Sequence, residues 1–247
     1  MKIALFIPCL VNHYSPHIAI DTLALLEKVG HDVYYPEGQT CCGQILTNSG
    51  CHKEAIGTVE ALSKSLLSEP CDFIVAPSAS CVVALKENIE RLENQEYTHK
   101  LVPKIYELTE FLHDICPISE SLKNVNKSVS MQMSCHGLRL LHLATPSELT
   151  VEKPFNKFFD ILKLIPQLDI RKPKRDECCG FGGSFCIDES DISGKMSIDK
   201  VNSHLATGAQ AIVAYDPSCM MSLQGIIDRN KIELEVLHIS SLLNQAL

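Results

Sequence analysis

Short apolar runs alternate along the chain with longer stretches in which apolar residues recur three and four positions apart. The first run covers residues 2–8, and helical spacing follows over about 15–29. Further runs at 31–35 and 73–76 flank a second helical stretch at about 52–67. Continuous apolar runs are typical of buried strands, whereas a 3.6-residue period indicates an amphipathic helix. The first half is therefore predicted to alternate strands and helices, beginning with a strand.

The same order of elements returns in the second half. Its predicted elements are strands at 128–133, 168–171 and 211–215, and helices that begin near Leu138 and cover about 192–205. Strands separated by helices of this length form parallel sheets with crossover helices. We therefore predict an α/β protein of two duplicated Rossmann-like lobes with mostly parallel sheets, related by a pseudo-twofold axis. Part of 145–166 has no counterpart in the first half and is an insertion.

Cysteines repeat together with these elements. In each half, one Cys follows the first strand, a Cys-Cys-Gly follows the second, and one Cys follows the third. The first set is Cys9, Cys41, Cys42 and Cys81, and the second set is Cys135, Cys178, Cys179 and Cys219. The spacing from the Cys-Cys-Gly motif to the last cysteine is 37 residues in one half and 38 in the other. This duplication predicts a first cysteine-rich lobe at 1–118 and a second at 125–247, with the boundary near 117–125.

Composition narrows the chemistry. The formal net charge of −8 is unlike the clustered positive charge of nucleic-acid-binding proteins. No apolar run is long enough for a transmembrane segment, and the N-terminal run lacks a small-residue cleavage site, so we expect a cytoplasmic protein. Twelve cysteines in a reducing compartment point to metal or redox use rather than to disulfides.

The topology brings the distant cysteines together. Functional groups in an open parallel sheet gather beyond the carboxyl ends of the strands, so each set is expected at one sheet edge. Several of these cysteines lie at predicted helix starts, where the helix dipole favours thiolates. Gly43 and Gly180 permit unusual backbone angles and close approach to a bulky inorganic group, and Gly182 and Gly183 extend this in the second half.

Three kinds of site are considered for the adjacent cysteines: structural zinc, an iron–sulfur cluster and a redox-active dithiol. Structural zinc generally uses Cys-x-x-Cys pairs, whereas a vicinal pair suits an iron–sulfur cluster, whose irons offer separate coordination points. Thiol redox chemistry is the third possibility, although a disulfide between neighbouring residues is strained. A phosphate-binding loop is disfavoured, because the glycine-rich stretch at 178–183 lacks the lysine of such loops.

At these residues the sequence resembles the CCG-type cysteine-rich family, which includes a cysteine-rich subunit of heterodisulfide reductase. The resemblance is greatest to the lactate-utilisation protein A family. It is carried by stretches over nearly the whole chain, at 8–9, 35–44, 48–51, 77–81, 134–139, 177–183 and 204–209. Ser78 and Asp216 stand where the wider family often has a further cysteine, so each half offers four thiolates, which suits a conventional [4Fe-4S] cluster.

The resemblance implies an oxidoreductase subunit that oxidises L-lactate to pyruvate. It implies two partners, a ferredoxin-like iron–sulfur subunit and a third subunit, and it implies that the first set holds one cluster. The second set matches the corresponding pattern. Exposed clusters are lost in air, so aerobically purified protein can lack them.

Candidate catalytic groups lie beside Cys135. His136 and Arg139 fall three residues apart on a predicted helix, where the first could take a proton and the second could bind the carboxylate of a small 2-hydroxy acid. The competing interpretation is that both support the cluster loop. The sequence has no nucleotide- or flavin-binding motif, so we expect the immediate hydride acceptor on another subunit. The alternative function is a non-catalytic metal- or thiol-based redox sensor or assembly scaffold.

Overall fold

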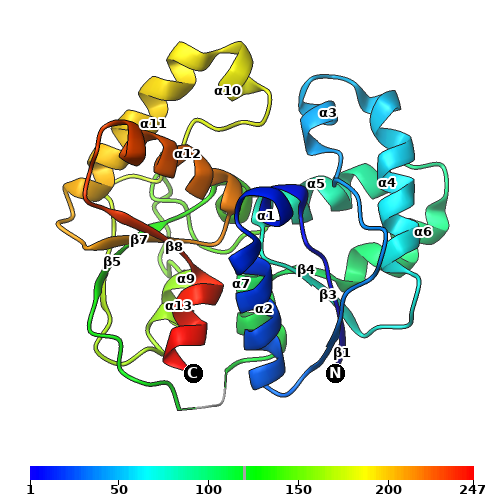
Figure 1. Ribbon diagram of the computed structural model, residues 1–247, viewed down its shortest axis with the longest axis horizontal. Helices are drawn as coiled ribbons and strands as arrows, with labels where there is room; N and C mark the ends of the chain where they lie inside the picture. The colour runs from blue at the N-terminus through cyan, green and yellow to red at the C-terminus, as the bar shows by residue number, and fades with distance from the viewer. Residues whose placement is uncertain (119–120) are drawn as a thin grey trace.

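The chain forms two α/β lobes, each built on a four-stranded parallel sheet (Figure 1). The computed structural model describes residues 1–118 and 121–247. The first sheet has the strand order β2-β1-β3-β4 and the second the order β6-β5-β7-β8. The strands are β1 (Lys2–Leu5), β2 (Asp32–Tyr34), β3 (Phe73–Ala76), β4 (Ile105–Glu107), β5 (Ser128–Gln132), β6 (Asp169–Arg171), β7 (Ala211–Ala214) and β8 (Glu235–His238). The predicted fold class is confirmed.

Helices connect the strands in both lobes. Those of the first lobe are α1 (Cys9–Tyr14), α2 (Pro16–Lys28), α3 (Gln44–Asn48), α4 (His52–Leu66), α5 (Ala79–Glu90), α6 (Gln95–Leu101), η1 (Val102–Lys104), α7 (Leu108–Glu110) and the π-helical η2 (Phe111–Ile115). Those of the second lobe are α8 (Cys135–Arg139), α9 (Lys157–Leu162), α10 (Phe185–Asp188), α11 (Ser190–Leu205), α12 (Pro217–Arg229) and α13 (Ile239–Ala246).

The two sheets have matching registers. In the first, Ile3 pairs with Val33 on one side and Phe73 on the other. In the second, Val129 pairs with Ile170 and Ala211. Each sheet therefore has its first strand in an inner position, and the cysteines after neighbouring strands are carried to one edge.

One predicted element differs from the structure. The helix expected from Leu138 begins at Cys135, where the Ser134 hydroxyl accepts the Gly137 N–H at 3.1 Å, and it ends at Arg139. The insertion then contributes α9, which begins where the Asn156 side chain accepts the Phe159 N–H at 2.8 Å. The capping side chains explain both helix starts, because each satisfies an amide that the first turn leaves free.

The lobes meet through helices of each lobe that pack against helices of the other. Figure 1 shows α2 of the first lobe beside α13 of the second, and α9 of the second lobe packs on α7 and η2 of the first. Lys28 donates to the Asn244 side chain at 2.7 Å, and Lys157 is paired with Asp114. One buried apolar cluster includes Ile3 together with residues of β5, β7 and α13, so the core is continuous across the interface.

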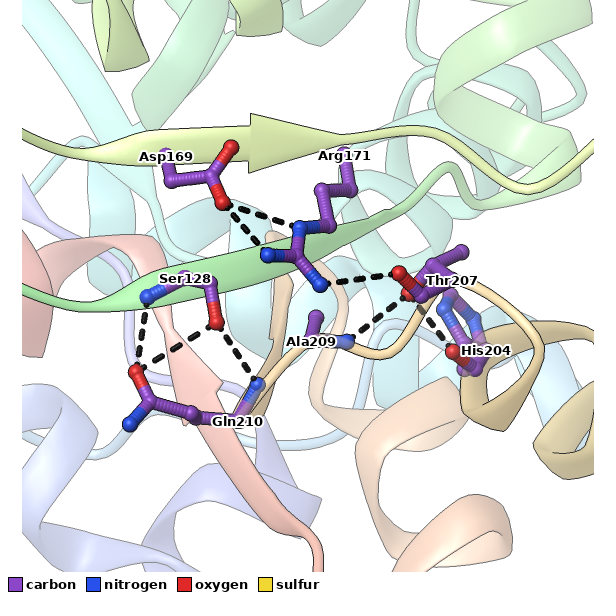
Figure 2. A network of polar contacts seen from close by, with 7 residues as sticks. All are labelled: Ser128, Asp169, Arg171, His204, Thr207, Ala209 and Gln210. Atoms are coloured by element: carbon purple, nitrogen blue, oxygen red, sulfur yellow. Dashed lines mark hydrogen bonds and ion pairs between the residues drawn. The ribbon is translucent and has the colours of Figure 1, made fainter.

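A polar network fixes the end of α11 to the second sheet (Figure 2). Arg171 donates to the Asp169 carboxylate at 2.7 and 2.9 Å and to the Thr207 carbonyl at 2.9 Å. The Thr207 hydroxyl in turn donates to the His204 carbonyl at 2.7 Å. Gln210 accepts the Ser128 N–H at 2.9 Å and completes the link to β5. The position of α11 over the sheet is thereby fixed.

Two further predictions from the sequence concern the boundary between the lobes and membrane-spanning segments. The division into lobes at 1–118 and 125–247 stays a prediction, and the boundary region at 117–125 includes residues 119–120, which lie outside the described part. Among the described residues, none of the helices combines the length and apolar character needed to span a bilayer.

Candidate metal centre

The eight cysteines of the two sets lie at the carboxyl edges of the two sheets. Cys9 and Cys135 are the first residues of α1 and α8, while Cys81 and Cys219 lie in the first turns of α5 and α12. Each set has an inner pair that is buried and an outer pair that is half-buried. The inner pairs are Cys42 with Cys81 and Cys179 with Cys219, and the outer pairs are Cys9 with Cys41 and Cys135 with Cys178.

The thiols within each pair contact one another. Cys9 Sγ lies 3.8 Å from Cys41 Sγ, and Cys179 Sγ lies 3.1 Å from Cys219 Sγ. The Cys135 thiol is hydrogen-bonded to Cys178 in the same way. Residues 32 and 40 positions apart in sequence are therefore brought into contact, as the parallel topology predicts.

Backbone amides point at one sulfur of each set. Gly43 N–H donates to Cys41 Sγ and Gly180 N–H to Cys178 Sγ, both at 3.4 Å. Both glycines are left-handed, with φ of +86° and +85°. A Cβ at Gly180 would lie 2.6 Å from the Ser193 carbonyl oxygen, so only glycine fits at that position.

These contacts favour the thiolate at one cysteine of each vicinal pair. The pKa of Cys41 lies far below the usual range of a thiol, because its sulfur accepts from Cys42, from Cys9 and from the Gly43 amide. The pKa of Cys178 is lowered in the same way, by Cys135 first and then by Cys179. The same hydrogen bonds, together with burial, raise the pKa of Cys42 and Cys179. In each set the contacts therefore favour the thiolate at one cysteine, and the thiolate is the form that binds metal.

His136 lies between the two sets. Gln44, the residue after the first Cys-Cys-Gly, donates its amide N–H to His136 Nε2 at 3.2 Å. The His136 proton then resides on Nδ1, which faces Cys135 Sγ at 3.9 Å. This arrangement supplies a hydrogen bond to a sulfur of the second set.

Arg139 is oriented differently from its predicted partner. Its guanidinium donates to the Glu148 carboxylate at 2.6 Å on the exposed surface. The structure therefore does not bring Arg139 to the cavity that His136 lines, and a catalytic role for either residue stays a prediction.

Asp216 links the two sets. Its carboxylate accepts the Ser80 N–H of the other lobe at 2.7 Å and the Ser218 N–H and hydroxyl at 3.1 and 2.5 Å. It thereby caps α12 and joins the residue before Cys81 to the residue before Cys219. The side chain is 1% exposed and its hydrogen bonds are directed at these serines, so it acts as a structural link between the lobes.

A small cavity of about 50 Å³ lies beside the second set. Its lining comes from both lobes: Gln44, Ser80, Cys135, His136, Cys178, Cys179, Phe181, Gly182, Gly183, Asp216, Ser218 and Cys219. Gly182 and Gly183 have φ of +57° and +70°, as their place in a close-approach loop predicts. Sequence inspection missed Gln44, Ser80 and Ser218, although each adjoins or closely follows a cysteine of a set.

The four other cysteines lie outside these pairs. Cys186 donates to the Gly183 carbonyl at 3.1 Å and Cys51 contacts the Ser49 carbonyl, while Cys116 contacts the His31 ring at 3.1 Å. Cys71 packs at the edge of the first lobe's apolar cluster. The contrast with the eight paired thiols separates site cysteines from the rest.

Comparison with known proteins identifies the family of the chain. The fold and paired cysteine sets define a duplicated cysteine-rich α/β protein, and the model of the CCG cysteine-rich domain matches residues 3–86 and 129–224. Over 99% of its length the chain is 34% identical to lactate utilization protein A of Halalkalibacterium halodurans and to that of Macrococcus caseolyticus, covering 97% and 96% of those proteins. The chain belongs to the lactate utilization protein A family of CCG cysteine-rich proteins.

Among solved structures, a hypothetical protein from Helicobacter pylori has a similar fold. It aligns over 99% of this chain with a TM-score of 0.61, at 11% sequence identity, and the chain spans 48% of its length. At that identity the likeness shows the architecture alone.

Proposed function

We propose that the chain is an iron–sulfur redox subunit of a system that oxidises L-lactate to pyruvate, with each cysteine set holding one cluster of the [4Fe-4S] type. The observation that carries this proposal is the gathering of eight cysteines into two matched sets, each with a backbone amide directed at one sulfur.

The donor sets suit such a cluster. A [4Fe-4S] cluster is held by four cysteine thiolates, the number that each set offers. The four thiols of each set are linked through the vicinal pair, and in residues 1–118 and 121–247 no group of three His, Cys, Asp or Glu is placed to hold a single ion. The Gly43 and Gly180 amides would stabilise negative charge on the ligating sulfurs.

Two other residues of the site would support the cysteine sets. His136 would donate to a sulfur of the second set, and Asp216 would hold the two sets in a fixed relation through Ser80 and Ser218. When bound, iron–sulfur clusters supply one-electron transfer, and two of them match the two electrons released when a 2-hydroxy acid becomes a 2-oxo acid.

The family supports the metabolic part of the proposal. The relatives are called lactate utilization proteins, and we place this chain in the same process. We propose that it acts as an oxidoreductase subunit with two partners, one of them a ferredoxin-like iron–sulfur protein. A cytoplasmic location remains a prediction from the cysteine usage.

Dithiol chemistry is the second candidate. Thiols 3.1 and 3.8 Å apart could form a reversible disulfide in protein that lacks metal, by exchange with an external disulfide that takes up the two electrons and two protons and is itself reduced to two thiols. A redox sensor would use this chemistry without clusters.

The test is to measure iron and acid-labile sulfide per chain, with electron paramagnetic resonance, on protein prepared without oxygen. We expect about eight irons in the wild type and about four in Cys41→Ser and in Cys178→Ser. Cys71→Ser, outside both sets, is the matched control and should retain the wild-type content. With the partner proteins added, L-lactate should reduce the clusters.

Two results would overturn the proposal. One is protein that folds but binds no iron under these conditions, with fully reactive thiols. The other is lactate oxidation that persists unchanged in the complex when both Cys41→Ser and Cys178→Ser are present.

A further inference from the structure

A lysine is buried close to the second set. Lys200 lies in the middle of α11, the helix whose Ser197 hydroxyl donates to the Cys179 carbonyl at 2.7 Å. Its side chain is 1% exposed. The ammonium makes one long hydrogen bond, of 3.5 Å, to the Arg175 carbonyl.

Burial of this cation is costly unless an anion compensates it. Among the described residues, no carboxylate lies within 4 Å of the Lys200 ammonium to form an ion pair. Burial lowers the pKa of Lys200, and the nearby acidic groups, Asp176 first, oppose this shift. Arg175, whose carbonyl accepts from the ammonium, lies three residues before Cys178, and Ser197, one turn before Lys200, donates to the Cys179 carbonyl. The cation therefore lies beside the loop that carries the second Cys-Cys-Gly motif.

The first set has no such cation at the matching position. A Cβ at Gly180 would meet the Ser197 side chain, and a Cβ at Gly43 would meet Val59, so these two residues correspond in the two lobes. Three residues further along each helix, Lys200 therefore corresponds to Leu62, which is fully buried and apolar. The duplicated lobes differ in charge at this position.

We propose that Lys200 is a positioning charge that raises the reduction potential of the cluster in the second set, and that this makes the two sets of the chain electrically unequal. The inference rests on the proposed function, because it assumes that both sets hold clusters. It goes beyond that function because it predicts that the charge of Lys200 makes the cluster of the second set easier to reduce than its ligands alone would.

The physical reason is a charge balance. Reduction adds one electron, taken from an external reductant, to the cluster iron, and the cluster becomes more negative by one unit without any bond breaking. A fixed buried cation stabilises the reduced form more than the oxidised form. Two unit charges about 10 Å apart at an effective dielectric constant of about 20 change an equilibrium roughly tenfold.

The polar network at the end of α11 keeps the charge in place. Arg171 and Thr207 fix the last turn of this helix to the sheet (Figure 2). A lysine on an anchored helix cannot move its backbone towards solvent. Lys200 is enclosed at 1% exposure, so its charge stays beside the Arg175 carbonyl, in the loop that leads to Cys178.

The test is a dithionite titration monitored by electron paramagnetic resonance, in the Cys41→Ser background, which leaves the second cluster alone. Replacing Lys200 with Met should reduce the ratio of reduced to oxidised cluster about tenfold at a given potential, equal to about 59 mV for one electron. Lys200→Gln should shift it similarly, and Lys200→Arg should restore the original ratio.

Two controls isolate the charge. Lys195→Met removes an exposed cation from the same helix and should leave the ratio unchanged, because water screens it. Leu62→Met, in the Cys178→Ser background, changes the side chain at the corresponding position of the first lobe without altering charge, and should leave the ratio of the first cluster unchanged.

The outcomes separate this inference from the proposed function. If the wild type binds no iron, the proposed function fails, and the inference fails with it. If clusters form but Lys200→Met and Lys200→Gln shift the ratio no more than Lys195→Met does, the inference alone is overturned. If Lys200→Met does not fold, Lys200→Gln takes its place in the titration, because glutamine retains a donor for the Arg175 carbonyl.

Discussion

Gly30, Gly43 and Gly180 offer a matched series for testing the geometry of the cysteine loops. All three have nearly the same left-handed backbone, with φ of +86°, +86° and +85°. They differ in what an added methyl group would meet. At Gly30 it would meet nothing within 4 Å, at Gly43 the side chains of Asn88 and Val59 at 3.0 Å, and at Gly180 the Ser193 backbone oxygen at 2.6 Å.

Alanine at each position should therefore cost different amounts of stability. The left-handed conformation alone costs a non-glycine residue about 1–2 kcal/mol, and this is the whole expected effect of Gly30→Ala. Overpacking adds about 1–3 kcal/mol, so Gly180→Ala should lose about 2–5 kcal/mol in total. Gly43→Ala should fall between them, because side chains can move more easily than backbone.

Urea denaturation of the reduced, metal-free protein measures these differences. A gap of about 2 kcal/mol between Gly30→Ala and Gly180→Ala moves the midpoint by roughly 0.7 M if the slope is about 3 kcal/mol/M. Equal slopes in the three variants would show that the denatured state is unchanged. Equal midpoints for Gly30→Ala and Gly180→Ala would refute the close approach of the second Cys-Cys-Gly loop to α11.

Three further predictions concern buried polar groups. Asp216→Ala should lose about 2–4 kcal/mol of unfolding free energy, since it removes a helix cap and leaves the Ser80 amide without its acceptor, and Asp216→Asn should lose less in the same urea assay. Burial lowers the folded pKa of His204 to about 3 from 6.5, so stability should fall by up to about 1.4 kcal/mol per pH unit as the pH drops below about 6.5. The unfolding free energy of His204→Gln should show a smaller slope there, and an unchanged slope would contradict the assignment. Burial raises the folded pKa of Glu107 well above 4.5, so the stability that its protonated form contributes is present at low pH and is lost as the pH rises. Glu107→Gln should therefore gain stability relative to the wild type between about pH 5 and pH 8. A difference in unfolding free energy that stays constant over this range would disprove the prediction.

The parallel sheets and the edge that holds the cysteines could be predicted because apolar periodicity and parallel topology determine both. The strand expected at 73–76 and the helix expected at about 52–67 lie where the structure has β3 and α4. Capping was harder to predict. Ser134 starts a helix at Cys135, three residues before the apolar period suggested, because one hydroxyl satisfies an amide of the first turn.

The contacts between the lobes could not be predicted from local patterns. Asp216 looks like an ordinary helix cap in sequence, and its bond to Ser80 depends on how two separate sheets meet. The burial of Lys200 could have been predicted from the sequence, since it falls on the inward-facing side of α11 with Ser197 and His204. A charged residue on that stripe indicates a buried cation, but not which anion it faces.

The packing of α2 against α13 has a consequence for biosynthesis. Lys28 and Asn244 bond to each other although they are 216 residues apart in sequence. Domains generally fold as they leave the ribosome, starting with the N-terminal one. The apolar side of α2 packs on the first sheet, but the part that α13 covers stays uncovered until that distant helix is translated, so the nascent first lobe exposes apolar surface for most of synthesis. The core between the lobes is therefore completed only when the last helix of the chain has been made.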